Sequence, residues 1–226
     1  MSQGSAAPAV EVANQAEGTP RAGGGRRLLF LLAGLIVVWT LLMRQFGGAD
    51  VYGVMGPYAL TVVTMVWLLR GRKVRDWFAP TRLAILTGLL VGVVMTAATY
   101  PAFRIAVSIM PWLDQQVQGL YAASRTTSLP VAMAWVTVII VAEELLWRGL
   151  LLEVLDKRVP RGLDVGLSVL TYALAQLGSG SWVVFALAAV CGSLWSMQRR
   201  LTHSLLSPLI SHMIWTHTVI LLWPVT

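Results

Sequence analysis

The sequence predicts an all-α protein, a polytopic membrane bundle of about seven transmembrane helices with one interfacial segment. Composition is the first indication: hydrophobic residues make up 57% of the chain and charged residues 12%, about half the charged share of a soluble domain. The mean hydropathy is +0.71. Apolar runs also recur along the chain, each near the length needed to cross about 30 Å of hydrocarbon.

The N-terminal residues differ from the rest of the chain. Residues 1–26 are rich in Ala, Gly, Pro and Ser and show no apolar periodicity, so we expect a disordered cytoplasmic tail. The apolar run after Arg26 and Arg27 is long enough to span the membrane and has no clear small-residue cleavage site, which favours an anchor over a signal peptide. The transmembrane domain is therefore expected over residues 27–226.

Apolar windows predict seven main helices in that domain. Their approximate ranges are 28–43, 55–70, 82–100, 129–152, 163–177, 181–198 and 203–223. The stretch between residues 101 and 128 contains two prolines and several polar side chains. We expect it to lie in the membrane interface, because an additional span there would break the charge alternation described next.

Basic residues predict the orientation. Clusters precede the first span and follow the second, fourth and sixth: Arg21, Arg26, Arg27, Arg70, Arg72, Lys73, Arg75, Arg82, Lys157, Arg158, Arg161, Arg199 and Arg200. All fall on one side of a seven-span bundle, which places the N-terminus in the cytoplasm and the C-terminus outside, in a bacterial-type inner membrane. The net charge of +7 comes largely from these loops, so we expect the lipid bilayer and no nucleic acid as a partner.

Glu143, Glu144 and Arg148 lie in the otherwise uncharged run from Leu129 to Leu152. A charge near the bilayer centre costs roughly 2.5–3.5 kcal/mol, so such residues are candidates for function. On a helix Glu144 and Arg148 are i,i+4 neighbours and can pair. Glu143 points about 100° away and has no local cation, which makes it a candidate general base. The alternative is a charge cluster that only holds helices together or lies at the water interface.

Few other polar residues lie at membrane depth. Tyr172 and Gln176 are one turn apart near the end of the fifth predicted helix, and His212 and Thr216 lie in the last one. A buried Gln or Thr usually makes a hydrogen bond between helices, whereas an intramembrane His is rarer and equally compatible with function. The single cysteine, Cys191, lies in an apolar run and is interpreted as a packing residue.

Three motifs in this order resemble the CPBP family, the CAAX-type intramembrane proteases that are grouped with bacteriocin-processing and self-immunity proteins. EELLWRG at 143–149 resembles the family's EExxxR motif, YALAQ at 172–176 its FxxxH motif, and SPLISH at 207–212 the approach to its last histidine. The resemblance covers about residues 129–217. It implies a helical membrane bundle with a polar cavity and an endopeptidase that acts on a protein or peptide substrate.

The resemblance also implies roles for individual residues. Glu143 would activate water, Glu144 and Arg148 would organise the site, and His212 with Gln176 would polarise the scissile carbonyl. Tyr172 and Thr216 would contact the substrate.

The sequence departs from the family pattern at two of these positions, where Gln176 replaces a histidine and Thr216 replaces an asparagine. The family's metalloendopeptidase chemistry makes zinc a possible cofactor, with His212 as the only family-matched ligand. The three histidines lie at positions 203, 212 and 217. Steps of nine and five residues turn about 180° and 140° around a helix, so a regular helix cannot aim all three at one zinc ion. Hydrolysis that depends on glutamate fits these residues better than zinc chemistry.

Three functions remain open at this point. The first is the intramembrane endopeptidase. The second is a catalytically inactive relative that acts as a membrane scaffold or self-immunity factor, which the residues at 176 and 216 favour. The third is a small transporter, which predicts intramembrane charges in several helices or broken repeats; the acidic residues at membrane depth here converge on one helix.

Overall fold

The computed structural model describes residues 22–46 and 51–225, and within these ranges every regular element is a helix. In chain order the elements are α1 (Ala22–Phe46), α2 (Val51–Arg70), α3 (Lys73–Trp77), α4 (Arg82–Ile109), α5 (Trp112–Ser124), α6 (Leu129–Glu143), the π-helix η1 (Glu144–Leu151), α7 (Leu152–Asp156), α8 (Leu163–Gln176), the 3₁₀ turn η2 (Leu177–Ser179), α9 (Trp182–Thr202), α10 (Leu206–Thr216) and the π-helix η3 (His217–Leu222). The all-helical bundle predicted from the sequence is confirmed.

Each of the seven predicted helices is present, with shifted ends. Of the tail expected at 1–26, residues 1–21 lie outside the described residues, and α1 already includes residues 22–26. The largest shift is in α4, which continues through Pro101 to Ile109 and so takes the first part of the expected interfacial segment. Proline has no backbone N–H, yet packed membrane helices tolerate it because neighbouring groups compensate for the lost hydrogen bond. The remainder of that segment forms the separate helix α5.

Four helical stretches are long and apolar enough to cross a membrane: Arg26–Gln45, Val51–Arg70, Arg82–Ile109 and Leu129–Asp156. The last combines α6, η1 and α7 in one continuous helix, and Leu206–Leu222 is a shorter apolar helix. The chain is therefore an integral membrane protein. The total of seven spans stays a prediction, because the other three predicted spans fall short in length or apolar character.

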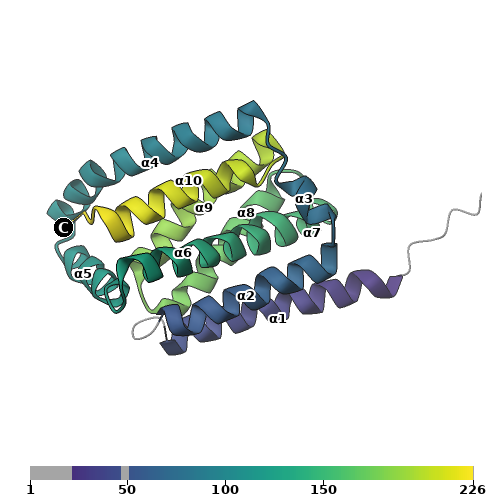
Figure 1. Ribbon diagram of the computed structural model, residues 1–226, viewed down its shortest axis with the longest axis horizontal. Coiled ribbons are helices and arrows are strands. Elements are labelled where there is room, and N and C mark those ends of the chain that lie inside the picture. The colour runs from purple at the N-terminus through teal and green to yellow at the C-terminus, as the bar shows by residue number, and fades with distance from the viewer. Residues whose placement is uncertain (1–21, 47–50, 226) are drawn as a thin grey trace, which may run out of the picture.

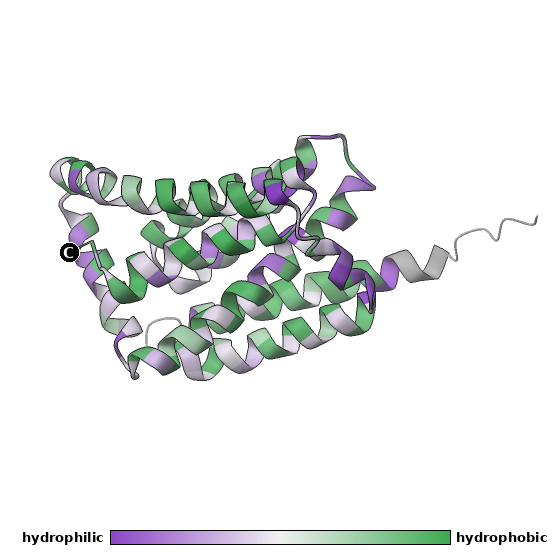
Figure 2. Cartoon of the chain, turned by 45° about the horizontal axis from the view of Figure 1, so that its top comes forward, coloured by the Kyte–Doolittle hydropathy of each residue, from purple (hydrophilic) through white to green (hydrophobic). Residues whose placement is uncertain are grey.

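The long helices run roughly side by side (Figure 1). α4 packs along α10, α10 contacts α6, and α6 packs against α2, which is followed by α1. α8 and α9 form a hairpin that contacts both α1 and α10 and so closes the bundle. Hydrophobic residues follow the sides of the helices in Figure 2, and hydrophilic residues gather toward the two ends of the bundle.

Small residues let several of these helices approach closely. A Cβ on Gly88 would lie 2.9 Å from the backbone oxygen of Ser207, and a Cβ on Gly92 would lie 3.0 Å from the Cα of Ser211. The pair of glycines spaced by four residues in α4 therefore serves packing against α10 inside the chain, as small-xxx-small pairs do between membrane helices.

Candidate active site

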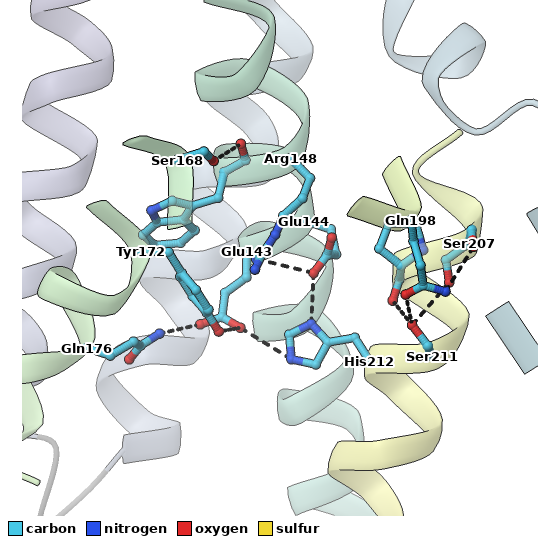
Figure 3. Close-up of polar contacts among 12 residues, drawn as sticks. Glu143, Glu144, Arg148, Ser168, Tyr172, Gln176, Gln198, Ser207, Ser211 and His212 are labelled. Atoms are coloured by element: carbon cyan, nitrogen blue, oxygen red, sulfur yellow. Dashed lines mark hydrogen bonds and ion pairs between the residues drawn. The ribbon is translucent and has the colours of Figure 1, made fainter. Parts of the chain in front are cut away.

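Glu143, the last residue of α6, is the centre of a polar cluster inside the bundle (Figure 3). Only 7% of its surface is exposed. Gln176, at the end of α8, donates a hydrogen bond from Nε2 to Glu143 Oε1 at 2.7 Å. The Tyr172 hydroxyl, one turn earlier on α8, donates to Glu143 Oε2 at 3.2 Å. The two polar residues of the second motif therefore both hold the first glutamate.

Glu144 makes a different set of contacts on the other side of the cluster. Its Oε1 lies 2.9 Å from Nδ1 of His212 and 3.4 Å from Nη1 of Arg148. Glu144 and Arg148 are almost completely buried. The predicted i,i+4 pair is thus present, and it extends to the histidine of the third motif.

The imidazole of His212 lies between the two glutamates. While its Nδ1 faces Glu144, its Nε2 is 3.6 Å from Glu143 Oε2. That distance is too long for a direct hydrogen bond and short enough for a water molecule to contact both atoms. The sequence predicted that the two glutamates point in different directions; the histidine contacts both of them, one through each ring nitrogen.

The backbone is unusual at this point. The helix changes from α to π geometry between Glu143 and Glu144 and keeps π geometry to Leu151. Every residue of η1 is buried. Short π segments inside α-helices occur frequently at functional sites, because the wider turn redirects side chains that α geometry would place elsewhere.

Aromatic rings hold the charged groups in place. The His212 ring stacks on Trp195 of α9 with a centroid distance of 3.6 Å and an interplanar angle of 20°. The Arg148 guanidinium lies over the Tyr172 ring at 4.3 Å and near the Trp195 ring at 5.3 Å. Such cation–π contacts offset part of the cost of a desolvated cation.

A glycine on α9 makes room for this arrangement. A Cβ on Gly192 would lie 2.9 Å from the Tyr172 ring and 3.0 Å from Nη2 of Arg148. Sequence reasoning missed both Gly192 and Trp195. A glycine and a tryptophan in an apolar helix are ordinary residues, and no local pattern distinguishes these two from the others.

A cavity of about 260 Å³ opens onto part of the cluster. Its wall includes Glu143, Tyr172, Gln176, His212 and Thr216. Glu144 and Arg148 are not part of that wall, so they lie behind the groups that a reactant can reach. The Thr216 hydroxyl is buried without a hydrogen-bond partner among the described residues, which leaves it available to a molecule in the cavity.

The donor atoms around the cavity do not form a zinc site. In the described part of the chain, no three His, Cys, Asp or Glu side chains are grouped to hold a metal ion. Both nitrogens of His212 face carboxylates, and the side-chain nitrogen of Gln176 faces Glu143. His217 contacts Thr137 and Met213 instead, and His203 is exposed at the end of α9. A zinc site needs three or four convergent ligand atoms, which these residues do not offer.

Charge is incompletely balanced in the cluster. Two carboxylates, one guanidinium and one imidazole lie within a few ångströms of one another and away from solvent. If both glutamates are ionised, Arg148 balances only one of them, so neutrality requires one proton shared among the glutamates and His212.

Residues 125–218 match a family model described as "Type II CAAX prenyl endopeptidase Rce1-like". The matched segment contains all three motifs and nearly coincides with the segment at 129–217 predicted to resemble the CPBP family, and that resemblance is confirmed. No curated protein and no solved structure matches the chain significantly.

Proposed function

We propose that this chain, whose residues 125–218 match the model of a CAAX-type endopeptidase family, hydrolyses a peptide bond of a membrane-associated protein by using Glu143 to activate water. One observation carries the proposal. Glu143 borders a cavity inside the bundle and lies 3.6 Å from a histidine nitrogen that borders the same cavity. A base and a second polar group thus face one space that is large enough for a water molecule and a peptide group.

The reaction follows from these positions. A water between Glu143 Oε2 and His212 Nε2 gives a proton to Glu143 as its oxygen attacks the scissile carbonyl carbon. Negative charge develops on the carbonyl oxygen. A proton on His212 Nε2, which is directed into the cavity, stabilises that charge. Glu143 then passes its proton to the leaving amine as the C–N bond breaks, so that a carboxyl and an amine product leave and the site returns to its first state.

Glu144 and Arg148 act on this reaction through His212. The Glu144 carboxylate accepts a hydrogen bond from Nδ1–H, and its negative charge favours the imidazolium form of His212, in which Nε2 also carries a proton. That proton can donate to the developing oxyanion. Arg148 pairs with Glu144 and balances its charge away from water. Gln176 was predicted to donate to the carbonyl; one of its two Nε2 protons donates to Glu143, and we assign the residue to positioning the base as well.

A second candidate function has an observation in its favour. Gln176 stands where the family has a histidine, and its amide satisfies Glu143 in the absence of any substrate. An inactive relative that acts as a scaffold or self-immunity factor would tolerate this replacement. The two functions differ in one measurable respect, because a scaffold does not need the acid–base chemistry of Glu143.

Purified protein in lipid vesicles, assayed with quenched-fluorescent reporter peptides tethered to the membrane, tests the proposal. We expect Glu143→Gln to lower the cleavage rate by about 10²- to 10⁴-fold, the typical contribution of a general base. Glu153→Gln is the matched control, because Glu153 lies on the same continuous helix and pairs with Arg70 and Lys157 away from the cavity. Equal cleavage by wild type and Glu143→Gln would exclude the mechanism. Function in cells that survives Glu143→Gln would favour the scaffold.

A further inference from the structure

We propose that the candidate active site receives its substrate from the non-cytoplasmic side of the membrane. The substrate would then be an exported polypeptide or one anchored in the outer half of the bilayer. The substrate part of this inference rests on the proposed function. The side on which the cavity opens rests on the structure and on the charge distribution alone.

The cavity extends from the polar cluster toward one end of the bundle. Its wall includes Met43 near the end of α1, Tyr52 at the start of α2, Ser124 at the end of α5 and Ser179 after α8. A hydrogen bond of 3.1 Å from the Tyr52 hydroxyl to the Ser124 carbonyl joins α2 to α5 at this end. None of the wall residues belongs to α3 or α7, which lie at the opposite end in Figure 1. The end bordered by α5 is called the mouth end below.

A second cavity points the same way. It has a volume of about 930 Å³ and is lined by the last part of α4, by α5 and by the first part of α9. It shares Cys191 and Trp215 with the wall of the first cavity. The first cavity and the second cavity beside it are therefore both in the half of the bundle that contains α5.

The path from the cluster to the opposite end is filled by side chains. Leu146 and Trp147 of η1 have no exposed surface. The Trp77 ring of α3 packs against Gly149, where an added Cβ would lie 2.7 Å away. A backbone hydrogen bond of 2.6 Å from Leu205 to Trp77 fixes α3 in that position. Together these residues form a plug between the polar cluster and α3.

The plug end also carries most of the basic residues. Among the described residues they are Arg26, Arg27, Arg70, Arg72, Lys73, Arg75, Arg82, Lys157, Arg158, Arg161, Arg199 and Arg200. At the mouth end the described chain has only Arg44, Arg104 and Arg125. Lys and Arg are concentrated in the cytoplasmic loops of membrane proteins, so the plug end faces the cytoplasm and the mouth end faces outward.

This sidedness defines the substrate class. A peptide presented from the cytoplasm would have to displace the buried η1 segment and Trp77 before it reached Glu143. A peptide presented from outside meets a wall of Met43, Val51 and Tyr52 and reaches Glu143 without disturbing the plug. The structure therefore favours the lumenal or extracellular segment of a membrane-anchored polypeptide.

Cysteine accessibility in oriented membranes tests the proposal. In a Cys191→Ala background, Ser179→Cys places one thiol in the cavity wall at the mouth end, and Arg72→Cys places one at the exposed plug end. A membrane-impermeant thiol reagent is added to right-side-out and to inside-out vesicles. We expect Ser179→Cys to react in right-side-out vesicles and Arg72→Cys only in inside-out vesicles. The reverse pattern, or reaction of both thiols from the same side, would overturn the inference.

The same variants separate this inference from the proposed function. The labelling pattern does not depend on catalysis and should be identical in a Glu143→Gln background. In a catalytically active chain, modification of Ser179→Cys from outside should also block cleavage of the tethered reporter. Cleavage blocked only by reagent inside would refute the sidedness and leave the peptidase proposal intact. Outward labelling without any cleavage would support the sidedness and refute the peptidase.

Discussion

α10 contributes to two buried polar clusters that differ in chemistry (Figure 3). One is the charged cluster of Glu143, Glu144, Arg148 and His212. The other, called the neutral cluster here, consists of Thr87, Gln198, Ser207 and Ser211 and joins α4, α9 and α10. Because Ser211 and His212 are adjacent, the two clusters meet in neighbouring residues of one helix.

The neutral cluster satisfies its own hydrogen bonds. Gln198 donates from Nε2 to Ser207 Oγ at 3.0 Å and to the Thr87 carbonyl at 3.2 Å. Ser211 donates to Gln198 Oε1 at 2.7 Å, and the hydroxyls of Thr87 and Ser207 are 2.8 Å apart. A network of this kind holds helices together and has no unused group to offer a reactant.

The charged cluster is not satisfied in this way. Glu144 Oε2 and all three guanidinium nitrogens of Arg148 are buried without a hydrogen bond to any described residue, although Arg148 lies in ion-pair distance of Glu144. The charged cluster also borders the cavity of about 260 Å³, whereas none of the four residues of the neutral cluster lines either of the two cavities described above. Buried polar groups left unpaired are uncommon, and a cluster that contains them and also borders a cavity indicates a site for chemistry or for a bound molecule. We therefore interpret the neutral cluster as structural and the charged cluster as functional.

Removal of the buried cation should give the largest effect. Arg148→Met leaves two carboxylates without their balancing charge, and we expect it to lower the free energy of unfolding by about 3–5 kcal/mol. Adding Glu144→Gln removes one of those carboxylates and should recover part of the loss. Denaturant titration in mixed micelles, followed by circular dichroism, measures both. If Arg148→Met is no less stable than a variant of the neutral cluster, the two clusters do not differ as described.

The helices and the motif could be predicted from the sequence because both depend on local patterns. Apolar runs gave all seven helices, and the i,i+4 spacing gave the Glu144–Arg148 pair. The change to π geometry at Glu144 has no signal in the residue types. His212 lies near both glutamates because a different ring nitrogen faces each of them.

Contacts between distant parts of the chain could not be predicted from those patterns. The stacking of Trp195 on His212, the fit of Gly192 against Tyr172 and the neutral cluster each join different helices. Gln176 was recognised as a replacement for histidine, but the sequence does not show that its amide contacts Glu143. Such contacts depend on how helices pack, and periodicity within one helix contains no information about its neighbours.

A smaller effect on the cleavage rate is expected when Glu143 loses its hydrogen bond from Tyr172 and the aromatic ring at position 172 remains. Tyr172→Phe keeps the contacts of the ring with Trp147 and Arg148 and removes only the 3.2 Å hydrogen bond to Glu143. We expect the cleavage rate to fall by about tenfold, or about 1.4 kcal/mol in the barrier. Thr171→Val is a neighbouring control, because the Thr171 hydroxyl bonds only within its own helix. A rate that falls equally in both variants would show that α8 packing is responsible and not the contact to Glu143.

The same substitution at the glutamine that contacts the charged cluster and at the glutamine of the neutral cluster gives the sharpest comparison and the smallest expected effect. Gln176→Leu removes the 2.7 Å hydrogen bond to Glu143, so it should reduce cleavage. Gln198→Leu removes hydrogen bonds that only join helices. It should leave the cleavage rate unchanged and lower the free energy of unfolding by roughly 0.6 kcal/mol for each hydrogen bond between helices that no other partner replaces.

Both glutamine variants are measured in the vesicle cleavage assay and by denaturant titration. The stability of Gln198→Leu should stay close to wild type, because Ser207 and Ser211 keep their contacts to Thr87 and to the backbone of α10. Loss of cleavage in Gln198→Leu with unchanged stability would show that the neutral cluster acts on the reaction through Ser211 and His212. In that case the two clusters would form one site, and the interpretation of the neutral cluster as purely structural would be wrong.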